Sequence, residues 1–335
     1  MRVLAAADKF KGTATAAQVC AAIGHACWDL DVDCTEIPLA DGGEGSLDVL
    51  GGANRRSVVT GPLGQPVDAE WRFHRGVAVI EMARASGLTL AGGAENNDPM
   101  GATTRGTGEL IDQALNLGAH KIIVCLGGSA TTDGGLGALR AISVPARLKA
   151  VEFLVACDVD TLFTDAARVF APQKGASRAQ VALLTGRLES LAAEYKVTHG
   201  IDIATQPGSG AAGGLAGALA ALGATLMPGF DIIAEETGFD EAVRTADMVI
   251  TGEGFLDATS FDGKVVGGVL DYCIDANVPV RAVVGDIDPS LDTGMLGDML
   301  VTSLVQMFGI GDAMEWPLRC IEDAARASLS PFTAG

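Results

Sequence analysis

The chain has 335 residues, of which 48% are hydrophobic, and this predicts two folded domains and excludes a disordered protein. Its formal net charge of -19 excludes general binding to nucleic acid or anionic membranes, because both need a large positive surface. The seven cysteines contain no C-x-x-C pair, and Cys20, Cys27 and Cys34 recur every seven residues, as buried apolar positions do. We therefore expect a reducing, cytoplasmic compartment.

The first fifty residues alternate between extended and helical patterns. RVLAAA predicts a strand, TAAQVCAAIGHACWDL predicts a helix opened by a capping box of Thr15 and Gln18, and CTEIPLA predicts a second strand. Asp8 and Lys9 come too early for a signal peptide, which again indicates the cytoplasm.

The middle of the chain has a different pattern. Residues 57–83 predict antiparallel strands with Gly-Pro turns, followed by a helix over 106–120, a strand over 121–127 and a long helix over about 177–195. Residues 208–230 carry no charge, but their glycine and alanine content makes them too weakly apolar for a membrane span. We expect no membrane helix.

The last third returns to strands that alternate with helices, at 247–252, 278–285 and 298–305 for strands and at 263–275 and 312–327 for helices. The sequence predicts an α/β fold with two α/β domains. One has a Rossmann-like parallel sheet built from both chain ends, over residues 1–60 and 228–335, and the other is a mixed α/β domain inserted at 61–227. The parallel sheet should combine Arg2–Ala7, Thr35–Leu39, Met248–Thr251 and Val280–Val284. A cleft between the domains is the expected ligand site.

Four glycine-rich loops stand at predicted strand ends: ADGGEG (40–45), GGSATTDGG (127–135), GSGAAGG (208–214) and TGEG (251–254). Each is expected to precede or open a helix, where unpaired N–H groups and the helix dipole bind phosphate. A tight turn is the alternative for any single loop, but four together indicate a phosphorylated ligand. The absence of G-x-x-x-x-G-K-[ST] excludes an ordinary P-loop ATPase.

Several charged residues lie where ligands bind in α/β proteins. Asp8 and Lys11 follow the first strand, Lys174 lies in a turn, and Lys264 opens a helix, where a cation is favourable only beside an anion. Arg105 precedes a helix and could hold a carboxylate; the alternatives are a solvated turn for the lysines and an ion pair with a neighbouring acid for Arg105. The histidines show no metal-binding spacing, and no G-x-S-x-G elbow occurs. Anion-binding loops, lysines and carboxylates together indicate phosphoryl transfer.

Eleven segments now form a recognisable series: DKFKGTATA, PLADGGEGSLDVL, VTGPLG, IEMARASGL, TTRGTGELI, GGSATTDGG, VACDV, PQKGAS, PGSGAAGG, VITGEGFLD and GKVVGGV. In this order, from the first strand to the C-terminal helix, the chain resembles the bacterial glycerate kinase family of the type that phosphorylates D-glycerate from ATP. The resemblance implies two α/β domains with the active site in the cleft between them.

Matched position by position, the resemblance implies a set of site residues. They are Lys11, Asp41 and Glu44 for catalysis, Asp8, Arg105 and Lys174 for substrate, Gly208, Gly210, Gly213, Gly214, Glu253 and Lys264 for the nucleotide, and Asp41, Asp133 and Asp257 for Mg²⁺. Lys9 is not part of the pattern.

The expected reaction transfers the γ-phosphoryl group of Mg·ATP to a hydroxyl of D-glycerate, with 2-phosphoglycerate favoured as product. Which of Asp41 and Glu44 binds metal and which orients the hydroxyl stays open. The alternatives are a kinase for another small hydroxy acid, or a nucleotide-binding pseudoenzyme. The second alternative is motivated by segments near 143–150 and 159–168 that are shorter than in relatives. The expected partners are D-glycerate and ATP, and the chain could form a homodimer.

Overall fold

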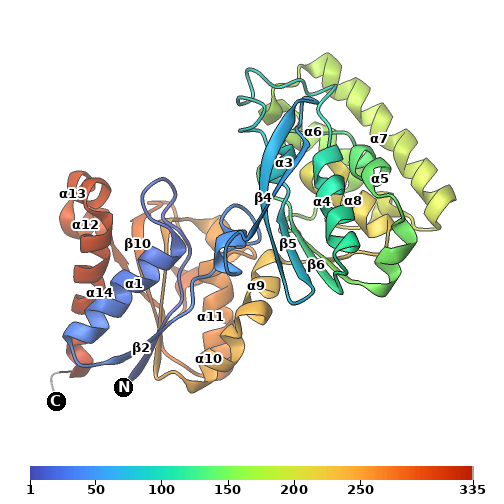
Figure 1. The fold of residues 1–335 in the computed structure, drawn as a ribbon. Helices are drawn as coiled ribbons and strands as arrows, with labels where there is room; N and C mark the ends of the chain where they lie inside the picture. The colour runs from blue at the N-terminus through green and yellow to red at the C-terminus, as the bar shows by residue number, and fades with distance from the viewer. Residues whose placement is uncertain (334–335) are drawn as a thin grey trace. The chain divides into compact units, whose positions relative to one another are not determined.

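The computed structural model describes residues 1–333, and their side chains up to residue 330. The chain divides into two compact units, the first formed by residues 1–41 with the segment from 230 onward and the second by residues 42–229. Figure 1 shows the blue N-terminal and red C-terminal segments within the same unit.

The first unit is built around a five-stranded sheet of order β11-β10-β9-β1-β2, in which every neighbouring pair is parallel. Its strands are β1 (Arg2–Ala5), β2 (Asp33–Glu36), β9 (Met248–Leu256), β10 (Val280–Ile287) and β11 (Leu300–Ser303). Its helices are α1 (Ala16–Asp29), α10 (Phe239–Thr245), η5 (Ala258–Phe261), α11 (Val265–Ala276), η6 (Thr293–Leu296), α12 (Leu304–Phe308), α13 (Ile310–Glu315) and α14 (Pro317–Thr333), and α9 (Gly229–Thr237) leads into it.

The predicted parallel sheet from both chain ends is confirmed. Val3 pairs with Met248 and Ala5 with Ile250, so the first strand lies beside a strand some 245 positions away in the chain. These strand residues are buried and apolar, as expected for a parallel sheet covered by helices on both faces. Figure 1 shows α1 and α14 together on one side of the sheet and α10 and α11 on the other.

The predicted capping box of α1 is also present. The Thr15 side chain accepts the Gln18 N–H, and the Gln18 side chain accepts the Thr15 N–H. This pair satisfies two of the N–H groups that a helix start leaves without a partner. It fixes where α1 begins, with ten residues between the end of β1 and the start of α1.

The second unit contains a six-stranded sheet of order β3-β4-β5-β6-β7-β8. Its strands are β3 (Arg55–Thr60), β4 (Pro66–His74), β5 (Val77–Glu81), β6 (Lys121–Cys125), β7 (Glu152–Ala156) and β8 (Thr225–Met227). Its helices are α2 (Ser46–Val49), α3 (Ala83–Ser86), α4 (Arg105–Asn116), α5 (Leu136–Ala141), η1 (Pro145–Ala150), η2 (Phe163–Asp165), α6 (Ala166–Phe170), η3 (Pro172–Lys174), α7 (Arg178–His199), η4 (Ile203–Thr205) and α8 (Ala211–Ala221).

The sheet of the second unit is mixed, as predicted. Strands β3, β4 and β5 are antiparallel, and β5 to β8 are parallel. Trp71 of β4 is buried among apolar residues of α4 and the central strands, and its indole N–H donates to Ser57 Oγ at 3.0 Å. The parallel half of the sheet presents its carboxyl ends, Glu81 and Cys125, in the same register.

Three details differ from the sequence analysis. The first unit gives way to the second at residue 41 rather than 60, because β3 pairs with β4 and therefore belongs to the second sheet. The TGEG segment lies inside β9 and opens no helix. The helix predicted over 312–327 is divided between α13 and α14, and α12 begins where the last two residues of the strand predicted over 298–305 were expected.

The uncharged stretch near residue 215 forms α8 (Ala211–Ala221), in which the helix is interrupted at Ala212, Gly213 and Gly214, whose φ values are 52°, 68° and 92°. Of the helices that the structure describes, none combines the length and the apolar character needed to cross a bilayer. Among the cysteines expected at buried positions, Cys20 and Cys27 are buried and Cys34 is partly exposed.

Candidate active site

In the first unit, charged side chains gather at the carboxyl ends of β1 and β9. The Asp8 N–H donates to the Gly252 carbonyl at 2.9 Å, which ties the loop after β1 to the interior of β9. Asp8 is in electrostatic contact with Lys9, Asp41 and Lys264, and Glu253 with Asp8, Asp257 and Lys264. We call Asp8, Lys9, Asp41, Glu253, Asp257 and Lys264 the strand-end cluster.

Two carboxyl groups of this cluster, those of Asp8 and Glu253, hold their protons unusually well, whereas the hydrogen bonds from Thr259 lower the pKa of Asp257. Burial raises the pKa of Asp8 to about 6, with Lys9 and Lys264 opposing the rise and Asp41 adding to it. Burial likewise raises the pKa of Glu253 to about 7, although a hydrogen bond from Ser260 and the charge of Lys264 lower it. A cation placed beside these groups would favour their ionised forms.

Glu253 also carries an unsatisfied atom. Its Oε1 is buried and has no hydrogen-bond partner, and such an atom is costly unless a ligand, a water or an ion satisfies it. Lys264 precedes α11 and donates from Nζ to Thr259 Oγ1 at 2.7 Å. Asp257 caps η5, because its Oδ1 accepts the N–H groups of Thr259 and Ser260.

Lys11 lies at the exposed tip of a tight turn. Phe10 and Ala14 exchange backbone hydrogen bonds of 2.8 and 2.9 Å, and Gly12 between them has a φ of 82°. The turn packs on β9, because a Cβ atom at Gly254 would lie 3.3 Å from the backbone nitrogen of Lys11. The glycines of TGEG thus let this turn and β10 approach β9 closely, since a side chain at Gly252 would come within 2.2 Å of the Val283 carbonyl oxygen.

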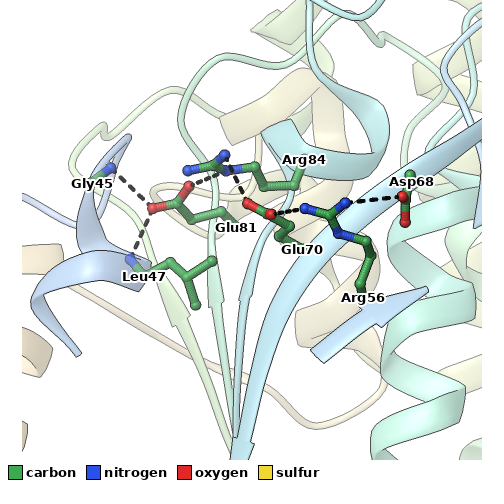
Figure 2. A network of polar contacts seen from close by, with 7 residues as sticks. All are labelled: Gly45, Leu47, Arg56, Asp68, Glu70, Glu81 and Arg84. Carbon is green, nitrogen blue, oxygen red and sulfur yellow. Dashed lines mark hydrogen bonds and ion pairs between the residues drawn. The ribbon is translucent and has the colours of Figure 1, made fainter. Parts of the chain in front are cut away.

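In the second unit, the loop that carries Glu44 is held at the ends of β5 and β6. Glu44 is exposed, between Gly42 and Gly45, whose φ values are 84° and 97°. The buried side chain of Glu81 accepts the N–H groups of Gly45 at 3.0 Å and Leu47 at 2.8 Å (Figure 2). The sequence analysis did not single out Glu81, although it lies in the IEMARASGL segment.

Arg105 adopts the arrangement that the sequence left open as its alternative. Its Nε donates to Glu109 Oε1 at 2.9 Å, and Glu109 also accepts the N–H of Thr60 at 2.7 Å. The Arg105 side chain is about half exposed, at 52%. Its assignment to a substrate carboxylate stays a prediction.

Asp133 accepts several hydrogen bonds within the second unit. Its Oδ2 accepts the N–H and the hydroxyl of Thr104, both at 2.9 Å, and the N–H of Gly137 at 3.1 Å. Its Oδ1 accepts the N–H of Gly135 at 3.1 Å. Asp133 therefore joins the beginnings of α4 and α5, and its assignment to Mg²⁺ stays a prediction.

Lys174 is buried, with 3% of its surface exposed. Its Nζ donates to Ser129 Oγ at 2.7 Å and to the Thr131 carbonyl at 2.6 Å, so it ties the turn after α6 to the GGSATTDGG loop. Burial lowers the pKa of Lys174 to about 7, and the charge of Asp133 opposes this shift. The Lys174 side chain therefore holds the GGSATTDGG loop by hydrogen bonds from the buried side of that loop.

The four glycines assigned to the nucleotide are buried where chain segments pack closely. A side chain at Gly210 would come within 2.4 Å of the Leu162 carbonyl, and one at Gly213 within 2.0 Å of the Thr131 carbonyl. Gly208 and Gly214 are equally confined, by Cys157 and by Phe163. Packing alone accounts for glycine at these positions, and their assignment to the nucleotide stays a prediction.

The structure thus brings together one group of the predicted site residues, Asp8, Asp41, Glu253, Asp257 and Lys264, and places Asp133, Lys174 and the four glycines in the packing of the second unit. Among residues 1–333, no three or more His, Cys, Asp or Glu side chains are arranged as a complete metal site. This is compatible with Mg²⁺, which commonly takes one or two carboxylates and completes its shell with phosphate and water.

Comparisons with known proteins agree on one family. The family model described as "Glycerate kinase family" matches residues 3–146 and 142–327. Glycerate 2-kinase of Escherichia coli K12 is 38% identical over 327 residues, covering 86% of each chain. Glycerate kinase of Halalkalibacterium halodurans is 36% identical over 368 residues, covering 97% of this chain and 96% of its own. A crystal structure assigned to glycerate kinase 2 from Salmonella typhimurium LT2 has a TM-score of 0.86 and 32% identity, covering 100% of this chain and 99% of that one.

We expect Asp133→Asn to destabilise the second unit by about 2–4 kcal/mol, because an amide NH₂ would face N–H donors that now have a carboxylate acceptor. Asp257→Asn should cost less than about 1 kcal/mol, because asparagine caps helices nearly as well as aspartate. Chemical denaturation of both variants measures the difference. Equal stability of Asp133→Asn and the wild type would contradict the structural role of Asp133.

The pH dependence of stability should report the burial of Lys174. Between about pH 7 and 10.5 the unfolded chain carries a proton on Lys174 that the folded chain lacks, so the free energy of unfolding should rise with pH across this window. The rise, relative to Lys174→Met, should approach about 1.4 kcal/mol per pH unit. Urea unfolding of both proteins from pH 7 to 9.5 tests this, and parallel pH profiles would refute it.

Proposed function

The chain belongs to the glycerate kinase family, and from this premise we propose that it transfers the γ-phosphoryl group of ATP to a hydroxyl group of D-glycerate. The observation that carries the proposal is the strand-end cluster. It places acids and lysines at the carboxyl edge of an open parallel sheet, where ligands of such sheets bind. Phosphoryl transfer needs groups of both charges, to neutralise phosphate and to accept a proton.

The roles follow from the chemistry of the step. The substrate hydroxyl oxygen forms a bond to the γ-phosphorus, the bond from that phosphorus to the bridging oxygen breaks, ADP leaves, and the hydroxyl proton passes to a carboxylate. Lys11, exposed on its turn, is suited to neutralise charge on the transferring group. Asp41 and Glu44 share the tasks of metal binding and proton acceptance, and Arg105 is proposed to hold the glycerate carboxylate.

The carboxylates of the first unit support a proposed Mg²⁺ site. Its ligand atoms would be the oxygens of Asp41 with Glu253 or Asp8, and the buried, unpartnered Oε1 of Glu253 would gain a partner. Bound Mg²⁺ would neutralise charge on the phosphate oxygens, which matters in a chain with a net charge of -19. Asp257 and Asp133 are the further candidate ligands that the resemblance implies, and both also accept hydrogen bonds from their own unit.

The finer features of the reaction are also proposals. One relative is named a glycerate 2-kinase, which supports 2-phosphoglycerate as the product. The implied site residues belong to both units, so an active site formed jointly by them stays a prediction from the resemblance, as do the cytoplasmic location and the homodimer.

The deciding experiment is phosphorus NMR of the product made from D-glycerate and ATP, with and without excess chelator. We expect 2-phosphoglycerate, formed only when Mg²⁺ is present. Turnover of another hydroxy acid in preference to D-glycerate would favour the first alternative. Nucleotide binding without turnover of any acid in a panel would favour the pseudoenzyme.

Lys11→Met and Asp41→Asn should each lower kcat by roughly 10²-fold or more, the usual scale for losing one electrostatic or acid-base group. Both residues lie outside the hydrophobic core, so the melting temperature should change little. Lys149→Met, which changes an exposed lysine of η1, is the matched control and should keep wild-type kcat. Wild-type kcat in either site variant would remove that residue from the mechanism.

A further inference from the structure

Glu81 is a buried carboxylate at the carboxyl end of β5, with 2% of its surface exposed. One of its oxygens, Oε1, accepts the two backbone N–H groups of Gly45 and Leu47 described above, and these flank the start of α2. Two bonds to one oxygen determine both the position and the orientation of the peptide segment that follows Glu44. Because the acceptor is ionic, these bonds are about twice as strong as neutral ones.

The second oxygen of Glu81 is held in turn by Arg84. Arg84 Nε donates to Oε2 at 3.2 Å, and Arg84 Nη1 lies 3.7 Å from Glu70 Oε2. Glu70 pairs with Arg56, which also pairs with Asp68, so alternating charges lead from β3 and β4 to Glu81 (Figure 2). The buried charge of Glu81 is therefore compensated by Arg84. Arg84 binds the oxygen that does not accept the loop N–H groups, and this fixes the rotamer of Glu81.

The loop that carries Glu44 is confined from another direction as well. A side chain at Gly127, after β6, would come within 2.9 Å of Gly43 Cα and 3.3 Å of the Glu44 nitrogen. The Ser46 hydroxyl donates to the Gly43 carbonyl at 2.8 Å. The backbone of Glu44 thus lies between β6 and the Glu81 carboxylate, while its side chain is exposed.

This arrangement is more than α2 needs in order to fold. The helix has four residues and buries Ser46 and Leu47. Burying an ion pair costs solvation that the pair often only just repays, so an apolar residue at the end of β5 could stabilise the fold as well. What an apolar residue could not do is fix the direction of the two N–H groups beside Glu44.

We infer that Glu81 is a positioning residue for the phosphoryl transfer: it holds the backbone of Glu44 so that the Glu44 carboxylate points at the reacting groups. The inference rests on the proposed function, because that function gives Glu44 its task. Reaction rates depend steeply on such placement, and a displacement of about 1 Å can cost about 10²-fold. Glu81 itself need not touch either substrate.

The test compares Glu81→Ala, Glu81→Gln and the control Asp112→Asn. Asp112 is a matched carboxylate of the second unit, since it accepts the N–H and the hydroxyl of Ser143 at 2.8 and 3.2 Å, and its hydrogen-bond partners Ser143 and Asn116 are not residues of the Glu44 loop. For Glu81→Ala we expect kcat to fall about 30-fold or more with KM for ATP and glycerate changed less than about 3-fold. Glu81→Gln keeps one acceptor oxygen, so its kcat should be at least about tenfold higher than that of Glu81→Ala. Asp112→Asn should keep wild-type kcat.

Hydrogen exchange at the Gly45 and Leu47 amides gives a readout that does not depend on activity. Both amides should exchange faster in Glu81→Ala than in wild type, and as slowly as in wild type in Asp112→Asn. Wild-type kcat in a folded Glu81→Ala, or unchanged exchange at both amides, would overturn the inference. If Glu81→Ala does not fold, Glu81→Gln decides. Faster exchange at the Gly45 and Leu47 amides together with wild-type kcat would overturn the inference, because the loop would be loosened without any loss of rate. A wild-type protein that phosphorylates no glycerate refutes the proposed function instead, and exchange then still decides whether Glu81 holds the loop.

Discussion

The pairing of β1 with β9 is the contact on which the first unit depends. It joins two chain segments that are adjacent only in the folded state, and it is made by backbone hydrogen bonds between buried apolar strands. Through it, Asp8 and Asp41, from the beginning of the chain, share an electrostatic environment with Glu253 and Lys264, from its last third. The raised pKa values of Asp8 and Glu253 follow mainly from the burial that the sheet imposes, with neighbouring carboxylates adding to the rise and Lys264 opposing it.

Most of the architecture could be predicted, because its determinants are local. Short apolar runs alternating with amphipathic ones predict strands and helices, and glycine and proline mark the turns between them. The boundary near residue 41 could not be read in this way, because the β-pattern of residues 55–60 does not say which strand it will pair with. The TGEG segment was predicted as a turn for the same reason. Its glycines are required by the close approach of β10 and of the Phe10–Ala14 turn, and both of these come from elsewhere in the chain.

The candidate site was predictable to a different extent in each unit. For Asp8, Asp41, Asp257 and Lys264 of the strand-end cluster, residue type and position after a predicted strand or at a predicted helix start were the signals, whereas Lys9 was left out and Glu253 lies within β9. For Asp133, Arg105 and Lys174, the sequence shows which groups are present but not which donors and acceptors surround them, and each proved to bind neighbouring parts of its own unit. Glu81 was missed because a single glutamate at the end of a strand has the same local pattern whether it is solvated or buried.

The second unit is one uninterrupted stretch of chain, whereas the first needs both ends. During synthesis on the ribosome, residues 1–41 emerge first but cannot complete their sheet until β9 has been made. The second unit can therefore fold while β1 still lacks its central partner. The apolar strand RVLA must wait through the synthesis of about 240 residues before β9 can pair with it, so during that time its unpaired edge is open to mispairing and to chaperone binding.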